Sequence, residues 1–309
     1  MKKYLKIYNS IFTILFIILI SGVILSSFFD LKINIAITNF NSAFGMICAS
    51  FGQLPCWCMI SFFGIMAFRI SHLIKRKIYK ILLIIFSFFI IGVSTYLIFN
   101  DMNSQYNGFY KISNFYIRIV LAFLFEIIMC FIGYKLINTD DLSVLLRLWI
   151  ILMITFFIGL LIVFIMKRIW ARPRYRLIYN GCNSYTVFEL FKPWYKVGPG
   201  LTESLYLDEI NSDDFRSFPS GHSYDSMASI LISYIPFLNR NQKDKPWISC
   251  LILGITSCYA LIIGFSRILY GAHFLSDVCF GGLICISCAF IIPYIGFKIS
   301  LRKENVKNC

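Results

Sequence analysis

Long apolar runs separated by short polar segments dominate the pattern of residues along the chain. A helix that crosses the hydrocarbon core of a bilayer needs about 20 mostly apolar residues. In these runs Ile, Leu and Phe follow one another without the period-2 alternation of a membrane strand, which favours helices over a barrel. Eight stretches are long enough to qualify, near residues 11–29, 52–71, 79–98, 115–137, 147–166, 222–238, 248–266 and 278–298.

Two of the eight stretches are less regular than the rest, because Pro55 lies near the start of one and Asp225 lies within another. The first stretch could be taken for a secretory signal. However, Ser26-Ser27-Phe28-Phe29 follows where a small-x-small cleavage site would be needed, so we expect an uncleaved anchor. The pattern therefore predicts an all-α fold. We expect a polytopic transmembrane bundle of about six to eight spans that forms a single integral membrane domain over residues 1–309.

Composition excludes the main soluble classes. Apolar residues make up 59% of the chain and charged residues 14%, with a mean hydropathy of +0.75. A soluble domain carries about 25% charged residues, so a soluble enzyme or a disordered chain does not fit. The net charge of +14 would suit a nucleic-acid partner, and the positions of the basic residues decide whether it does.

The basic residues encode membrane orientation. If the N-terminus is cytoplasmic, most Lys and Arg residues fall on the inner side. Of the outer ones, only Lys32, Lys111 and Arg118 precede residue 167. The positive-inside rule therefore predicts that both termini are cytoplasmic, in a multi-pass protein of the cell membrane. The basic balance then reflects topology and contact with anionic lipid, and we expect no nucleic-acid partner.

A cluster of basic residues on the outer side breaks this pattern. Most of its members lie in the loop between the fifth and sixth stretches, about residues 167–219, which is the longest loop of the chain. Long loops are usually functional, although a solvated loop that tolerates charge is the alternative. The cluster consists of Lys167, Arg168, Arg172, Arg174, Arg176, Lys192, Lys196, Arg216 and Arg267.

Three short motifs fall on the same predicted membrane face. KRIWARPRY occupies residues 167–175, PSGH occupies 219–222, and SRILYGAHFLSD occupies 266–277. Pro219 suits the first turn of a helix, whose N–H groups and dipole favour an anion. Ser220 and Gly221 would present such groups, because glycine lets an anion approach the backbone. His222 would lie beside that anion, and its titration range suits acid–base chemistry.

The third motif adds a candidate nucleophile. His273 and Asp277 are four residues apart, which places one above the other on a helix face. A carboxylate there can fix the imidazole tautomer and leave the other ring nitrogen free to attack. Lys167, Arg174 and Arg267 supply cationic donors for phosphate oxygens. These residues describe a phosphoryl-transfer site that needs neither a metal nor a cofactor.

The motifs resemble those of the type 2 phosphatidic acid phosphatase superfamily: Lys-x6-Arg-Pro, Pro-Ser-Gly-His and Ser-Arg-x5-His-x3-Asp. The second and third match in full. The first matches with Lys167 and Arg174 in register, although Tyr175 replaces the proline. Aligning Arg172-Pro173 instead would put Ile165 where the lysine belongs. The resemblance covers roughly residues 145–298, which we predict as the phosphatase core, with part of the active site on the long extracytoplasmic loop.

The resemblance implies a role for each site residue. His273 is the nucleophile that forms a phosphohistidine, Asp277 orients it, and His222 is the general acid. The implied phosphate ligands are Lys167, Arg174, Ser220, Gly221 and Arg267, and no metal is implied.

The predicted function is hydrolysis of a lipid phosphomonoester or diphosphate at the extracytoplasmic face. Undecaprenyl diphosphate, phosphatidylglycerol phosphate and phosphatidate are candidate substrates, and the resemblance favours an isoprenoid diphosphate. One alternative is a lipid phosphotransferase that uses the same site with a hydroxyl acceptor. Another is a non-catalytic membrane protein that only binds or transports phosphate.

Several polar residues stay open at this level. Glu126 lies within an apolar stretch, where an ionised group is either functional or a buried structural partner. Asp225 either tunes His222 or pairs with a loop cation. Asp213-Asp214 is expected to form a turn. Most of the eleven cysteines lie in apolar stretches and are expected to pack there as small buried residues.

Overall fold

The protein is described here by a computed structural model, which covers residues 2–101, 115–137, 141–180, 190–198, 212–235 and 247–307. These residues form helices and no strands, which confirms the predicted all-α class. The elements are α1 (Lys2–Ile37), α2 (Ala43–Phe51), α3 (Leu54–Leu73), α4 (Lys77–Asp101), α5 (Phe115–Leu136), α6 (Leu142–Trp170), α7 (Tyr175–Asn180), η1 (Ser212–Phe215), α10 (Gly221–Met227), η2 (Ala228–Tyr234), α12 (Trp247–Leu269) and α13 (Leu275–Lys307).

Within the described residues, six helices are long and apolar enough to cross a membrane. Large apolar side chains remain exposed on them, such as Phe28 on α1 and Ile127 on α5. Such exposure suits lipid, which is as apolar as the side chains themselves. A shorter apolar helix, Leu275–Ile291, forms the first part of α13. The count falls within the predicted range of six to eight.

Two of the eight predicted spans are not among the six long helices. One, 278–298, falls on the shorter apolar helix Leu275–Ile291. The other is 222–238. Its described part forms α10 and η2, which are not among the six long apolar helices. The reason is that this segment packs inside the protein and its polar side chains find partners there. The Tyr224 hydroxyl donates to the Phe156 carbonyl at 2.7 Å, and the hydroxyls of Ser233 and Tyr8 lie 2.7 Å apart.

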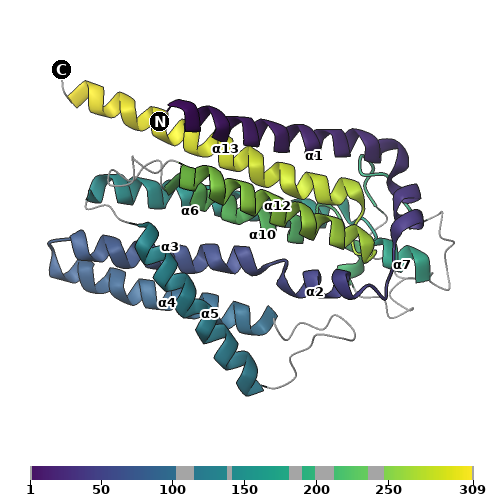
Figure 1. The fold of residues 1–309 in the computed structure, drawn as a ribbon, viewed down its shortest axis with the longest axis horizontal. Coiled ribbons are helices and arrows are strands. Elements are labelled where there is room, and N and C mark those ends of the chain that lie inside the picture. The colour runs from purple at the N-terminus through teal and green to yellow at the C-terminus, as the bar shows by residue number, and fades with distance from the viewer. Residues whose placement is uncertain are drawn as a thin grey trace.

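The helices run mostly along one axis of the molecule (Figure 1). α1 and α13 lie side by side, with the N-terminus and the last turns of α13 at the same end. α3, α4 and α5 pack against one another and form a group on the opposite side of the molecule from α1 and α13. The main apolar core lies between these groups and includes Met59, Phe62, Phe156, Tyr224 and Leu253. α12 and α13 meet at the end of the bundle away from the termini.

Two turns at that end bring the motifs together. Ala171 follows α6 with a φ of 41°, a left-handed conformation that ends the helix. Gly271 has a φ of 66°, and a Cβ there would lie 2.6 Å from the Phe40 ring. Glycine is therefore required where the chain reverses between α12 and α13. The Gly271 carbonyl accepts from Arg176 N at 2.9 Å, which ties this turn to the segment after α6.

Candidate active site

Backbone hydrogen bonds join the three motifs at the end of the bundle away from the termini. Ser220 N donates to the Asp277 carbonyl at 2.9 Å, which ties the second motif to the third. Ser217 N donates to the Arg172 carbonyl at 3.0 Å, which ties the first motif to the segment before the second. Because these bonds join main chains, the relative positions of the motifs do not depend on side-chain rotamers.

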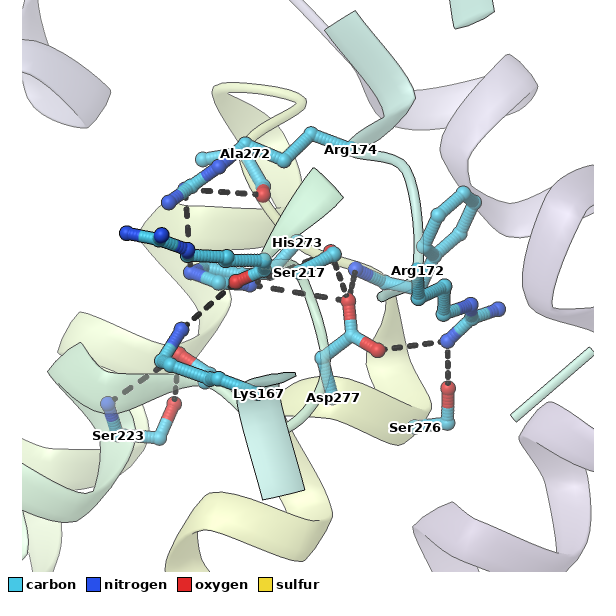
Figure 2. A network of polar contacts seen from close by, with 12 residues as sticks. Lys167, Arg172, Arg174, Ser217, Ser223, Ala272, His273, Ser276 and Asp277 are labelled. Carbon is cyan, nitrogen blue, oxygen red and sulfur yellow. Dashed lines mark hydrogen bonds and ion pairs between the residues drawn. The ribbon is translucent and has the colours of Figure 1, made fainter. Parts of the chain in front are cut away.

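His273 and Asp277 lie together at the centre of this region (Figure 2). His273 Nδ1 is 3.7 Å from Asp277 Oδ2, and both side chains are buried. The same carboxylate oxygen accepts from Ser217 Oγ at 2.5 Å and from Phe274 N at 2.8 Å. Two donors therefore hold the carboxylate on the Nδ1 side of the ring, which leaves Nε2 on the other side.

The Nε2 side of His273 faces a cation. Arg174 Nη1 lies 3.5 Å from His273 Nε2 and 3.5 Å from the Ala272 carbonyl. Burial holds the pKa of His273 well below its usual value; the Asp277 carboxylate opposes this effect, and the charges of Arg174 and Lys167 add to it. The imidazole is therefore neutral at neutral pH, with a lone pair available for attack on an electrophile.

The second motif lies beside this pair. Ser220 caps α10, and its Oγ accepts from Ser223 N at 3.3 Å and lies 3.0 Å from Ser223 Oγ. Lys167 lies over Gly221, where a Cβ would be 3.5 Å from Lys167 Cε. Lys167 Nζ donates to the Arg216 carbonyl at 2.8 Å. The Lys167 side chain of the first motif therefore lies next to the backbone of Gly221 in the second.

His222 is buried at the start of α10. Burial lowers the pKa of His222 well below its usual value, and the charges of Arg267, His273, Arg174 and Lys167 act in the same direction. Arg267 is fully buried at the end of α12, and its carbonyl accepts from Ala272 N at 3.0 Å and His273 N at 3.3 Å. The structure thus brings all eight residues predicted for the site to the same end of the bundle.

The sequence alone did not assign a partner to Arg172. It is fully buried, and its Nη1 donates to Asp277 Oδ1 at 2.6 Å and to Ser276 Oγ at 2.7 Å. Its Nη2 donates to Asp30 Oδ2 at 2.8 Å, and its Nε to the Lys192 carbonyl at 2.9 Å. Arg172 therefore lies behind Asp277, on the side away from His273 (Figure 2). Arg174 is the arginine that faces Nε2 of His273.

The turn expected at Asp213-Asp214 is present as η1, and its carboxylates also bind arginines. Asp213 Oδ2 accepts from Arg174 Nη2 at 2.7 Å, and Asp214 Oδ1 accepts from Arg176 Nη2 at 2.7 Å. The Asp213 side chain is 46% exposed, so water and ions can compete for it. Arg174 thus already has an exchangeable anionic partner.

Asp225 and Glu126 have neutral hydrogen-bond partners. Asp225 is buried and accepts from Gln53 Nε2 at 3.0 Å, at the junction of α2 and α3. Glu126 Oε2 accepts from the hydroxyls of Ser61 at 2.9 Å and Ser94 at 3.3 Å. Of the two readings left open, the structure supports the buried structural partner for Glu126. For Asp225, it shows an amide donor rather than a loop cation.

Two other residues beside His273 and Asp277 lie outside the three motifs. Ser217 lies three residues before the second motif's serine and carried no sequence signal, although it donates to Asp277. Asp30 directly follows the first apolar stretch, and an isolated carboxylate next to such a stretch usually has a partner. That observation alone could have marked Asp30, but not its partner.

No three His, Cys, Asp or Glu side chains among the described residues are arranged to hold a metal ion. Nine cysteines in this part of the chain are free thiols, mostly buried, as expected of small packing residues. Cys182 and Cys309 lie outside the described residues.

Comparison with known proteins agrees with the geometry. Phosphatidylglycerophosphatase B of Bacillus subtilis (strain 168) is 32% identical over 94 residues, which cover 28% of this chain and 43% of that protein. The match thus spans less than half the length of this relative. No solved structure matches the chain. Residues 144–300, about half of the chain and including all three motifs, match the PAP2 superfamily of the type 2 phosphatidic acid phosphatases, and the chain belongs to that superfamily.

Proposed function

We propose that the protein is a membrane lipid phosphatase that works through a phosphohistidine on His273. The observation that carries this proposal is the placement of His273 between a carboxylate and a cation, with Asp277 on the Nδ1 side and Arg174 at Nε2. A site that only bound phosphate would need the cations. It would have no need of a buried, oriented and neutral imidazole.

The reaction follows from this placement. His273 Nε2 attacks phosphorus, the N–P bond forms, and the bond from phosphorus to the lipid oxygen breaks. His222 donates a proton to the departing oxygen, so that the lipid leaves as an alcohol or a shorter phosphate. A water then attacks phosphorus, gives its proton to His222, and releases inorganic phosphate while His273 is restored.

The remaining site residues would stabilise the transferring phosphoryl group. Lys167, Arg174 and Arg267 supply positive charge, Gly221 supplies a backbone N–H group, and Ser220, whose own N–H is bonded to the Asp277 carbonyl, supplies its hydroxyl. Buried cations are effective here because their orientation is fixed before the charge develops. All charge stabilisation in this scheme comes from protein side chains, so we propose that activity does not require a metal.

The bilayer identifies the substrate class. The long apolar helices would keep the site at one membrane surface, where a lipid headgroup can reach it while the tail stays in the bilayer. The site lies at the end of the bundle opposite the termini. With cytoplasmic termini, it would face the extracytoplasmic side. Phosphatidylglycerol phosphate is the first substrate to try because of the name of the B. subtilis relative.

The test is phosphate release by purified protein in detergent, with phosphatidylglycerol phosphate, undecaprenyl diphosphate and phosphatidate supplied separately. We expect release from at least one lipid, unchanged by a chelator and abolished by His273→Ala. His72→Ala is the matched control, because His72 is exposed at the end of α3. Release that survives His273→Ala would contradict the mechanism, and loss on chelation would contradict metal independence.

The same assay separates hydrolysis from transfer. If a lipid or sugar hydroxyl is the true acceptor, adding it will convert released phosphate into a phosphorylated product while the dependence on His273 is kept. Sidedness is tested with a membrane-impermeant thiol reagent on intact cells. Labelling of a Cys182-only variant but not of a Cys309-only variant is expected, and the reverse would invert the proposed topology.

A further inference from the structure

The first helix reaches the nucleophile, although it lies outside residues 144–300. Asp30 and Asn34 are one helical turn apart on α1, and both are buried. Asn34 Nδ2 donates to the His273 carbonyl at 3.2 Å. Asp30 lies beside the first turn of α13, which carries Asp277. Two polar side chains of α1 therefore contact the segment from His273 to Asp277.

Asp30 acts as a cap for α13 from another helix. Its Oδ1 accepts from Ser276 N at 3.1 Å, and its Oδ2 accepts from Ser276 Oγ. A carboxylate at a helix N-terminus satisfies an N–H group that has no partner within the helix and interacts favourably with the helix dipole. Asp277 is the next residue, so the position of its backbone depends on this contact.

Asp30 also changes the charge next to Asp277. Arg172 donates to both carboxylates, at 2.8 Å to Asp30 and 2.6 Å to Asp277, and all three side chains are at most 3% exposed. A buried pair of Arg172 and Asp277 alone would be neutral. With Asp30 ionised, the three side chains carry one positive and two negative charges, so one negative charge remains beside His273.

This remaining charge matters for the reaction proposed above. When Nε2 of His273 bonds to phosphorus, the ring becomes a cation and its positive charge is shared with Nδ1. A negative charge fixed near Nδ1 before the reaction stabilises that cation without reorganisation. Arg172 would cancel this effect if Asp277 were its only partner.

We propose that Asp30 is a positioning residue of the phosphatase site, which anchors the first turn of α13 and offsets the charge of Arg172. The inference rests on the proposed function, since it assigns Asp30 a part in forming the phosphohistidine. It adds to the site a residue from a helix that the family match does not include.

The test compares Asp30→Asn with wild type in the phosphate-release assay. Asparagine keeps the size of the side chain and removes its charge. We expect kcat to fall by about 10- to 100-fold, the range typical when a residue that orients a metal ligand through a hydrogen bond is replaced. We expect KM to change by less than about threefold, because the lost interaction strengthens only as the ring becomes charged. Loss of a merely structural contact would instead lower the amount of folded protein and leave kcat per folded molecule unchanged.

Ser26→Ala is the matched control. Ser26 is buried on the same helix one turn earlier, and its hydroxyl donates to the Val23 carbonyl of its own helix. We expect its kcat to stay within about twofold of wild type, as is usual away from special contacts. A kcat for Asp30→Asn within the same twofold range overturns the inference.

A double variant tests the charge argument directly. In Asp30→Asn/Arg172→Gln both charges are lost and Asp277 keeps its own, so kcat should exceed that of Asp30→Asn by several-fold, a coupling expected for residues in contact. A double variant no more active than the single one overturns the inference. If Asp30→Asn does not fold because Arg172 loses one of its two carboxylate partners, the double variant decides alone: a kcat above about a tenth of wild type supports the inference, and a lower one overturns it.

The two proposals fail in different ways. A wild-type protein that releases no phosphate from any lipid contradicts the proposed function. An active wild type together with an equally active Asp30→Asn contradicts only the role of Asp30.

Discussion

Two buried carboxylates lie in the helices that precede the family-matched region, and their surroundings differ. Asp30 on α1 contacts the guanidinium of Arg172 and, through it, Asp277. Glu126 on α5 contacts the neutral hydroxyls of Ser61 and Ser94. The first region is charged and continuous with the site, whereas the second is neutral and belongs to the group of α3, α4 and α5.

The difference shows why burial alone does not identify a functional acid. A carboxylate in an apolar span needs hydrogen-bond donors wherever it lies. Hydroxyl donors meet that need locally and join helices. A charged donor that also binds a second carboxylate couples the two acids electrostatically, so the charge of one acid affects the surroundings of the other. The partners of a buried acid, rather than its depth, therefore indicate whether it takes part in chemistry.

The largest effect is expected where the charged region meets the nucleophile. Asp277→Asn should lower kcat by about 10³- to 10⁴-fold, because the amide no longer fixes the imidazole tautomer or stabilises its cation. The measurement is steady-state phosphate release. Asp141→Asn is the control, since Asp141 caps the other end of α6 and asparagine is an equally good cap. A loss of less than tenfold would place the chemistry elsewhere.

The next effect concerns the cation on the other side of the ring. Arg174→Gln should lower kcat/KM by about 10²- to 10³-fold, as expected for removal of one fixed donor to the transferring group. Arg176→Gln is the matched control, because Arg176 lies two residues further on and pairs with the partly exposed Asp214. Equal losses in the two variants would show that Arg174 contributes only general positive charge.

A smaller effect tests the ion pair that occupies Arg174. Asp213→Asn removes the anion that a substrate phosphate must displace, so KM should fall. The gain is at most about fivefold, because a half-exposed pair contributes no more than about 1 kcal/mol. Substrate-saturation curves measure it, with Asp214→Asn as the control. A rise in KM would mean that Asp213 holds Arg174 in its productive position.

The smallest effect is expected in the neutral region. Glu126→Gln keeps acceptors for Ser61 and Ser94, so kcat should stay within about twofold of wild type and thermal stability should fall by about 1 kcal/mol or less. Thermal unfolding in detergent and the release assay measure the two quantities. A large fall in kcat in a folded Glu126→Gln protein would show that the neutral region takes part in the reaction as well.

Much of the fold follows from the sequence because lipid leaves the backbone few choices. A segment without water must satisfy its N–H and C=O groups internally, so apolar runs of sufficient length become helices. The same argument failed at residues 222–238. The apolar side chains of residues 222–235 are mostly buried in protein, and Tyr224 and Ser233 have partners in other helices. Hydropathy cannot distinguish these two apolar surroundings.

The site was predictable where its geometry is local. His273 and Asp277 are neighbours because a spacing of four residues makes them so, and Arg172 and Arg174 of the first motif were both visible in the sequence. The sequence did not predict that Arg172 lies behind Asp277 while Arg174 faces His273. This difference depends on Asp30 and Asp213, which are distant in sequence. Asp30 lies 142 residues from Arg172, and no periodicity links the two.

That separation also sets an order in time. The ribosome adds about 5 to 20 residues per second, so Asp30 is made about ten seconds before Arg172. During this interval α1 carries a carboxylate whose partner has not been synthesised, at a cost of a few kcal/mol for a span that already lies in lipid. Ser276 arrives later still. The polar side chains of α1 therefore meet their partners only after the start of α13 has been made.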